Sequence, residues 1–341
     1  MTLRVPHLAT LCLALLVIAA SFAARPLNAH ANFFAPTSVW NQPLAANAPL
    51  DPNSAAYVRE LVRQATPRTA GGYGAGIQTT SFGVPIYTVG AAQPRVPVKL
   101  DTASPILGAA FKAGIPLPTS AVAAAGSDGN LAVYQPSTDT IWEFWRLARK
   151  ADGWHSQWGG KLVGVSRNPG VYRNVLGPDG KNFIERCFWG APSSKFSVVA
   201  GVIRINELRS GVIPHALALH LPEIRAGVRN FPAQATDGRT ASASSIPMGA
   251  HLRLDPSINV NAMPWPPAIK ALARAAQTYG VVVNNHSGDV GFRAEDPRQF
   301  GSDPYPALFG NQSASQLMRQ FPWDKLRMLK LDLRSGGCSN V

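Results

Sequence analysis

Residues 130–165 contain short segments rich in aromatic and β-branched residues, and they constrain the fold more than any other part of the chain. The segments are 131–135, 140–146 and 153–165, and turn-forming residues stand at 127–129, 136–139 and 152–153. Such side chains suit a pleated sheet, and tight turns between consecutive strands favour antiparallel pairing. The pattern predicts a mainly β fold with a few helices, arranged as an antiparallel β-sandwich, jelly-roll-like, or as a partly closed barrel.

The flanking sequence adds further strands and a few helices. Strands are expected at 83–89, 96–100, 197–203, 215–221 and 251–254, and helices at 53–64, 266–279 and 313–321. Gly280 is a typical helix-stopping residue, and a strand at 281–284 is expected to form a hairpin with 289–294. No internal repeat or linker divides the chain, which predicts a single β-rich domain.

Residues 1–31 have the pattern of a cleavable export signal. Arg4 provides the positive start, residues 8–24 are an apolar run, and Ala29 and Ala31 are the small residues that a signal peptidase requires. The run is short for a spanning helix, which needs about 20 residues, but an uncleaved anchor is the alternative. We expect the mature chain, residues 32–341, to be secreted or periplasmic, with no stable membrane span after cleavage.

The charge of the chain suggests the class of partner. The formal net charge is +13, with 32 Lys and Arg against 19 Asp and Glu, and the basic residues are scattered along the sequence. An exported basic protein is suited to an acidic partner such as an anionic polysaccharide, a teichoic-type polymer or a membrane surface, and nucleic acid is not an expected partner outside the cell. The alternative is that the charge only keeps the protein soluble.

Two cysteines remain after the signal is removed, Cys187 and Cys338. In an oxidising compartment they can form a disulfide that ties the C-terminal tail to the middle of the chain. The alternative is a pair of free thiols.

The first candidate for catalysis is Glu143, in the sequence Ile-Trp-Glu-Phe-Trp-Arg at 141–146. A carboxylate amid apolar surface is costly to bury, and its pKa can rise until it is a usable acid or base. Tryptophan, imidazole and amide groups on neighbouring segments suit a sugar-binding cleft. The substrate-binding candidates are Trp145, Arg146, His155, Trp158 and Gln234. The alternative is a Glu143–Arg146 pair inside an aromatic core.

Two more residues are candidates for the catalytic set. His215 opens an expected strand and is a possible general base, although a histidine on an apolar face is more often a core residue. Asp237 lies in a polar loop and is a possible second carboxylate of the kind that glycoside hydrolysis requires, although an Asp-Gly turn is the ordinary interpretation. In the segment 284–289, which reads as a hairpin turn, His286 and Asp289 are outside candidates. The histidine spacings match no metal-ligand pattern, so neither a metal nor a cofactor is expected.

The order of several short motifs resembles a group of exported, uncharacterised bacterial proteins of the actinobacterial type. The motifs are His-Ala-Leu at 215–217, Pro-Ala-Gln at 232–234, Pro-Met-Gly at 247–249 and Tyr-Gly at 279–280. The resemblance covers roughly residues 38–330 and implies no reaction. The β-rich layout is also similar in style to jelly-roll polysaccharide hydrolases and lyases.

Two hypotheses follow from these residues. The first is an exported carbohydrate-active enzyme that cleaves a polysaccharide, either a glycoside hydrolase or a polysaccharide lyase, with Glu143 as acid or base. The second is a non-catalytic cell-envelope or glycan-binding protein that uses the same aromatic face. The accessibility of Glu143 distinguishes them, because a catalytic carboxylate must reach a cleft.

Overall fold

The structure, a computed structural model, describes Met1 and residues 33–67, 73–176, 183–184 and 188–336. Residues Asn32–Val341 form one compact unit. Within the described residues, this unit is mostly β: sixteen strands form four open sheets, accompanied by six α-helices. The expected export signal and both Cys187 and Cys338 lie outside the described residues, so the signal and the disulfide stay predictions.

The largest sheet has six strands in the order β1-β16-β11-β15-β14-β17. Its strands are β1 (Ala75–Gln78), β11 (Leu217–Leu221), β14 (His251–Leu254), β15 (Val281–His286), β16 (Val290–Arg293) and β17 (Leu326–Met328). The two central strands β11 and β15 run parallel, and all of β11 and the first four residues of β15 are buried.

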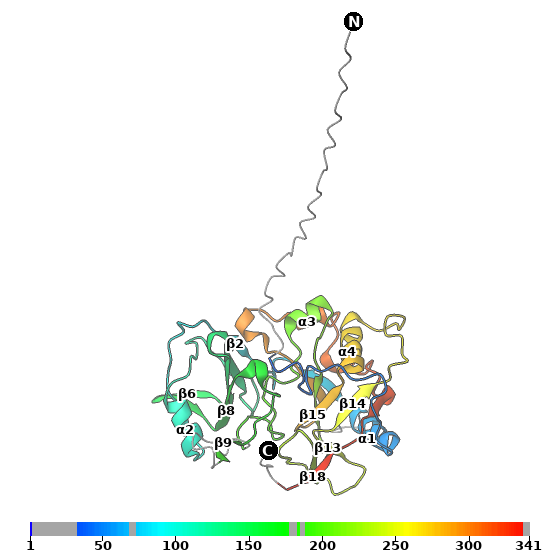
Figure 1. Cartoon of the computed structure of the whole chain (residues 1–341), viewed down its shortest axis with the longest axis horizontal. Helices are drawn as coiled ribbons and strands as arrows, with labels where there is room; N and C mark the ends of the chain where they lie inside the picture. The colour runs from blue at the N-terminus through cyan, green and yellow to red at the C-terminus, as the bar shows by residue number, and fades with distance from the viewer. Residues whose placement is uncertain (2–32, 68–72, 177–182, 185–187, 337–341) are drawn as a thin grey trace. The chain divides into compact units, whose positions relative to one another are not determined.

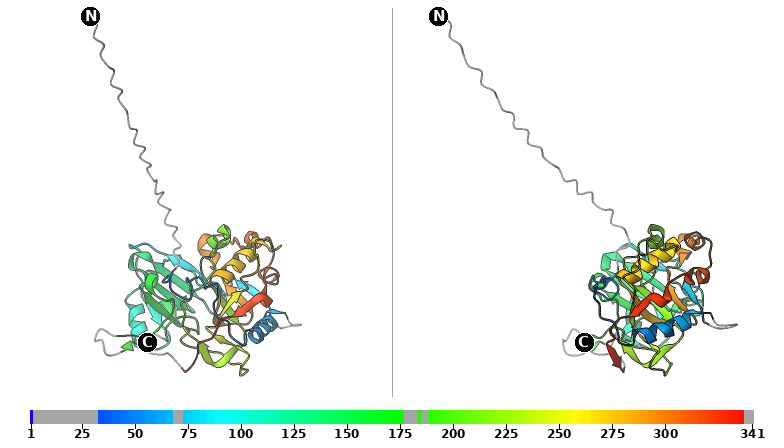
Figure 2. Two further views of the ribbon diagram at one scale, coloured as in Figure 1. Left: turned by 45° about the vertical axis from the view of Figure 1, so that its right-hand side comes forward. Right: turned by 90° about the vertical axis from the view of Figure 1, so that its right-hand side faces the viewer.

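The second sheet has four strands in the order β2-β4-β5-β8. Its strands are β2 (Ile86–Thr88), β4 (Leu131–Gln135), β5 (Thr140–Trp145) and β8 (Trp158–Val163). Asp139 adopts a left-handed conformation (φ 46°) in the turn that reverses the chain from β4 to β5. Figures 1 and 2 show the four-stranded and six-stranded sheets side by side within the unit.

Two three-stranded sheets and one short strand pair complete the β structure. One is β3 (Val98–Leu100), β7 (Gly153–Ser156) and β6 (Ala148–Lys150), and the other is β13 (Ile246–Met248), β12 (Ile224–Asn230) and β18 (Leu333–Ser335). The pair is β9 (Val175–Leu176) with β10 (Phe183–Ile184).

The helices cover the sheets. They are α1 (Ser54–Ala65), α2 (Pro105–Lys112), α3 (Ile205–Ser210), α4 (Pro267–Thr278), α5 (Tyr305–Leu308) and α6 (Ala314–Met318). Helix α4 packs on β14 and β11, α1 on β17, and α6 on β1. Gly280 ends α4 at φ 89°, and a Cβ there would lie 2.2 Å from His251 Nε2, so glycine is required by both conformation and space.

The mainly β prediction is confirmed, but the pairing prediction was wrong in two respects. Five strand pairs are parallel, so the sheets are mixed rather than antiparallel. Strands β15 and β16 do not form a hairpin, because β11 lies between them. A turn between two strands in sequence does not exclude the insertion of a third strand, and parallel pairs leave no local signal in sequence. Residues 197–203 contain turns and an isolated bridge at Ile203 instead of the expected strand.

Candidate functional site

A cleft of about 490 Å³ is lined by residues of both large sheets. The four-stranded sheet contributes the ends of β5 and β8, and the six-stranded sheet contributes the ends of β15 and β16. The loops at 127–130 and 191–195 also line it. Its charged and strongly polar residues include Asp128, Asn130, Lys195, Asp237, Asn285 and Arg293. The cleft therefore combines carboxylates, cations and amides.

Two tryptophans form the aromatic wall of this cleft. Trp145 and Trp158 are directly opposite each other in the β5–β8 pair, so their side chains lie on the same face. Both are half-buried. The Trp145 indole N–H donates to Asp128 Oδ1 (3.3 Å) and that of Trp158 to the Phe188 carbonyl oxygen (3.0 Å), which fixes both rings. Two aromatic side chains held in place along a cleft are suited to contact a flat ligand such as a sugar ring.

A second hollow of about 610 Å³ continues the first. The two share Asp128, His286 and Arg293, and the second adds Gln78 and Asp289. Burial raises the pKa of the Asp289 carboxyl group, although Gln78 Nε2 at 3.5 Å partly opposes this. A carboxyl group with a raised pKa stays protonated to a higher pH than an ordinary Asp, which favours a role as a proton donor. We call the two hollows together the inter-sheet groove.

Residues 191–198 join the two sheets beside the groove. On one side, the amide N–H of Ala191 and Val198 and the Ser197 hydroxyl group donate to the Glu143 carboxylate in β5, at 2.8, 3.0 and 2.7 Å. On the other side, the amide and hydroxyl groups of Ser193 donate to Asn285 Oδ1 (3.0 and 2.7 Å), and the Ser194 hydroxyl group donates to Asn284 Oδ1 (2.7 Å), both in β15. We call residues 191–198 the bridging segment, because they are hydrogen-bonded to both large sheets.

Glu143 is therefore buried and does not line the groove. Its exposed fraction is 0%, and both carboxylate oxygens accept hydrogen bonds from the bridging segment. Burial raises the pKa of this carboxyl group, and the hydrogen bonds from the bridging segment offset that rise only in part. The adjacent Tyr172 hydroxyl group also lowers the pKa, although it does not have the geometry of a hydrogen bond. The raised pKa agrees with the expectation from sequence, but the carboxylate does not reach a cleft. This contradicts the expected catalytic role of Glu143 and removes the observation by which the sequence would have favoured an enzyme over a binding protein. An enzyme acting in the groove would have to use other carboxyl groups. Glu143 also does not pair with Arg146, which was the expected alternative.

Lys195 of the bridging segment brings an amine into the groove. It is half-buried and adopts a left-handed conformation (φ 68°). Burial lowers the pKa of Lys195, and the charges of Glu143 and Asp237 oppose this shift. Nothing in the local sequence identified this residue, because its position depends on the conformation of a turn.

The predicted site residues divide between the groove and other parts of the unit. Trp145, Trp158 and Asp237 all line the groove, with Asp237 exposed at its rim. Arg146 is exposed, places its guanidinium group 4.4 Å from the Trp145 ring centre and donates to the Ser127 carbonyl oxygen. Gln234 is 1% exposed and donates to the Pro232 carbonyl oxygen, so its amide does not reach the groove.

Neither His215 nor His155 lines the groove, whereas His286, an outside candidate, lines both of its halves. His215 is buried and contacts both carboxylate oxygens of Glu207 at 3.1 Å. Burial lowers the pKa of His215, but the Glu207 carboxylate outweighs this and leaves the pKa raised. His155 in β7 contacts Asp101 (2.7 Å) and Asp152 (2.9 Å) in a cluster of surface charges. Both contacts stabilise local structure away from the groove.

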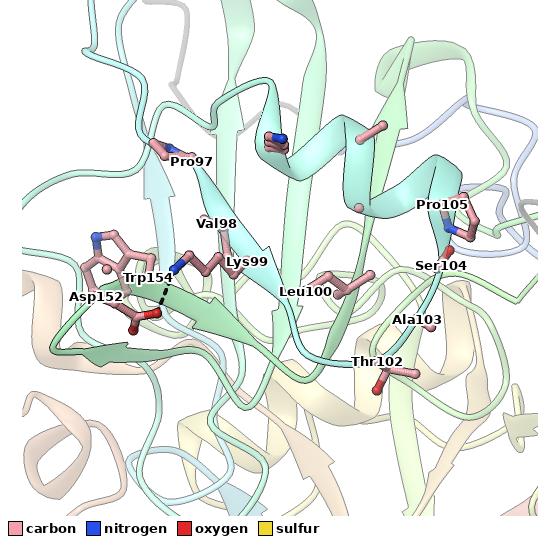
Figure 3. A pocket seen from close by; sticks show the side chains of 14 residues that line it. Pro97, Val98, Lys99, Leu100, Thr102, Ala103, Ser104, Pro105, Asp152 and Trp154 are labelled. Carbon is pink, nitrogen blue, oxygen red and sulfur yellow. Dashed lines mark hydrogen bonds and ion pairs between the residues drawn. The ribbon is translucent and has the colours of Figure 1, made fainter.

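A separate pocket of about 720 Å³ lies between α2 and the β3–β7 pair (Figure 3). Its lining is mainly apolar, with Leu100, Pro105 and Trp154 along it, and the Lys99–Asp152 ion pair (2.6 Å) at one end. It is larger than either half of the groove, but its opposite charges are already paired. We therefore place the candidate chemistry in the groove.

Neither a metal site among the described residues nor a known relative points to a different functional site. Within residues 33–67, 73–176 and 188–336, no group of three or more His, Cys, Asp or Glu side chains is placed to hold a metal ion. In the same part of the chain, no helix has both the length and the apolar character needed to cross a membrane. No family model matches the chain, and no match was found among curated proteins or solved structures.

Proposed function

We propose that this protein is an exported enzyme that hydrolyses a polysaccharide in the inter-sheet groove. The observation that carries the proposal is the juxtaposition, along one groove, of the paired Trp145 and Trp158 with the carboxyl groups of Asp128 and Asp289. Aromatic faces bind sugar rings, and two carboxyl groups perform the acid and base steps of glycoside hydrolysis. That the sheets form a jelly-roll-like sandwich, and that the chain belongs to the actinobacterial-type group, remain separate proposals. The proposed hydrolysis depends on neither of them.

The two carboxyl groups have different surroundings, as the reaction requires. Asp289 has the raised pKa of a proton donor, and we assign it as the general acid that protonates the leaving oxygen. Asp128 accepts the Trp145 N–H and lies 3.9 Å from the Arg293 guanidinium group. We assign Asp128 as the second carboxylate, which activates water or attacks the anomeric carbon.

A lyase reaction is the second candidate, because Lys195 is an amine with a lowered pKa in the same groove. Such an amine can remove the proton at C5 of a uronic acid. The electron pair then forms the C4–C5 double bond and the glycosidic oxygen leaves from C4. The product absorbs ultraviolet light, whereas the hydrolysis product does not.

The first experiment is an activity screen of residues 32–341 on neutral and acidic polysaccharides, which records both reducing ends and the absorbance of unsaturated uronates. We expect reducing ends without that absorbance, and a loss of about 10²–10⁴-fold in kcat for Asp289→Asn and Asp128→Asn. Asp152→Asn, at the apolar pocket, is the matched control and should retain activity.

Other results would change the proposal in defined ways. Absorbance that Lys195→Met abolishes would establish the lyase. Absence of cleavage across the panel, with binding retained, would overturn the enzyme proposal and leave the glycan-binding alternative.

A further inference from the structure

Arg293 lies where the two halves of the inter-sheet groove meet. It is the last residue of β16, is 2% exposed and lines both hollows. Its neighbour in the sheet is Gln78 of β1. A charged side chain this deeply buried is normally held by several hydrogen bonds or by an ion pair.

Among the described residues, the guanidinium group of Arg293 makes no hydrogen bond, and its one ion pair, with Asp128, is long. Its Nε is buried without a hydrogen-bond acceptor, and none of its side-chain nitrogens donates to a described protein atom within hydrogen-bonding distance. The nearest carboxylate, Asp128, is 3.9 Å from Nη2, which is too long for a hydrogen bond. The Glu143 carboxylate attracts it electrostatically, but accepts its hydrogen bonds from the bridging segment.

The neighbouring groups of the protein do not supply the hydrogen-bond acceptors that Arg293 lacks. His220 lies in β11 opposite Gly291, is fully buried, and has no hydrogen-bond partner on either ring nitrogen within the described chain. Burial and the charge of Arg293 hold the pKa of His220 well below its usual value, so the ring is neutral. Burial also lowers the pKa of Arg293 itself, to about 10. The guanidinium group remains charged at neutral pH, with unused donors beside an open groove.

We propose that Arg293 binds a carboxylate group of the substrate, so that the groove is specific for a polysaccharide that contains uronic acid. A carboxylate accepts two parallel hydrogen bonds from a guanidinium group and would supply the hydrogen-bond acceptors that Arg293 lacks within the described chain. Lys195, in the adjoining half of the groove, provides a second cation for an acidic chain. The inference names the substrate class of the proposed function, but carboxylate binding can be tested without any cleavage.

The test uses pairs of oligosaccharides that differ only in the carboxyl group. Calorimetry at low salt compares residues 32–341 binding to oligogalacturonate, oligomannuronate and unsulfated chondroitin oligosaccharides with their carboxyl-reduced counterparts. We expect at least one uronate to bind ten-fold or more tightly than its reduced counterpart. Arg293→Lys, which retains the charge but not the paired donors, should lose about ten-fold in affinity, and Arg293→Met should lose most of the binding.

Two controls separate recognition from folding. Arg149→Met removes an exposed arginine that lies over Trp154, outside the groove, and should bind as the wild type does. Because the Arg293 guanidinium group makes no hydrogen bond to the described chain, Arg293→Met should have an unchanged or raised Tm. If Arg293 instead stabilised the fold, Arg293→Met would have a lower Tm than the wild type.

The outcomes distinguish this inference from the proposed function. Equal affinity for each uronate and its reduced counterpart, or unchanged binding by Arg293→Met, would overturn the inference. Preference for a sulfated neutral oligosaccharide would overturn the assignment to carboxylate. Uronate binding without cleavage would support the inference and contradict the enzyme proposal. Cleavage of neutral polysaccharides alone would support the enzyme proposal and contradict the inference.

Discussion

The Ser197 hydroxyl group donates a 2.7 Å hydrogen bond to the Glu143 carboxylate, and both groups are fully buried. This bond and those from Ala191 and Val198 connect the bridging segment to β5. All three groups that contact the Glu143 carboxylate donate hydrogen bonds, so both of its oxygens must act as acceptors. Glu143 therefore fixes the segment that carries Lys195 into the groove.

We expect Glu143→Gln to lower the free energy of unfolding, because an amide NH₂ group would face donors that have no other acceptor. The expected loss is about 2 kcal/mol, against about 1 kcal/mol for Ser197→Ala, which removes one of the three bonds. Urea unfolding of both variants measures the difference. If Glu143→Gln were as stable as the wild type and yet inactive, Glu143 would be catalytic, as the sequence suggested.

The paired tryptophans should contribute directly to ligand binding. We expect Trp145→Ala and Trp158→Ala each to weaken oligosaccharide binding by about ten-fold, or about 1.4 kcal/mol, because each removes one aromatic face from the groove. Calorimetric titration provides the measurement. Trp154→Ala, in the apolar pocket, is the matched control, and an equal loss in that variant would place the sugar site elsewhere.

The pH dependence of hydrolysis should report the Asp289 carboxyl group. A general acid must be protonated, so the rate falls as the pH rises through its pKa, which burial raises. Gln78 lowers this pKa through its hydrogen bond. We therefore expect Gln78→Leu to move the alkaline limb of the kcat profile to higher pH. A limb that stays in place or moves to lower pH would show that another group is the acid.

Stability should fall in mild acid because of His251. Its Nε2 bonds to the Tyr279 carbonyl oxygen (2.9 Å), and burial lowers its pKa from 6.5 to about 4 despite this bond. The unfolded chain takes up a proton below pH 6.5, whereas the folded chain does so only near pH 4, so stability is lost as the pH falls between these values. The loss from this group is on the order of 2 kcal/mol between pH 7 and 4.5.

The matched variant is His251→Gln, which retains a donor for the Tyr279 carbonyl oxygen but does not titrate. Urea unfolding at pH 7 and at pH 4.5 should show a smaller difference for the variant than for the wild type. The same difference in both proteins would assign the acid sensitivity to other groups, among them His220, whose pKa is also lowered.

The sequence predicted individual elements better than their assembly. Helix α4 and strands β4 and β14 match their expected ranges almost to the residue, because local periodicity, proline and Gly280 determine them. The expected strand at 153–165 is in fact β7 and β8, which belong to different sheets and separate at Gln157. Neither glycine nor proline stands between Trp154 and Trp158, so the local sequence gives no sign of the change.

The candidate site was predicted in part for the same reason. Trp145, Trp158 and Asp237 were identified from residue type, and all three line the groove. Arg293 and Lys195 were missed, since neither stands in a recognisable motif. What distinguishes Arg293 is a buried guanidinium group that makes no hydrogen bond to the described chain, which is a property of the folded chain alone.

The bridging segment also fixes the width of the groove. Both of its ends are bonded to Glu143 in the sheet that carries the tryptophans, and its middle is bonded to Asn284 and Asn285 of the sheet that leads to Asp289 and Arg293. Eight residues therefore act as a spacer between the tryptophans that we propose stack on a sugar and the groups that we propose react with it. A change in the length or conformation of this spacer would admit a thinner or bulkier polysaccharide while both sheets stayed as they are. Substrate range in proteins of this architecture can thus diverge through one turn-rich segment.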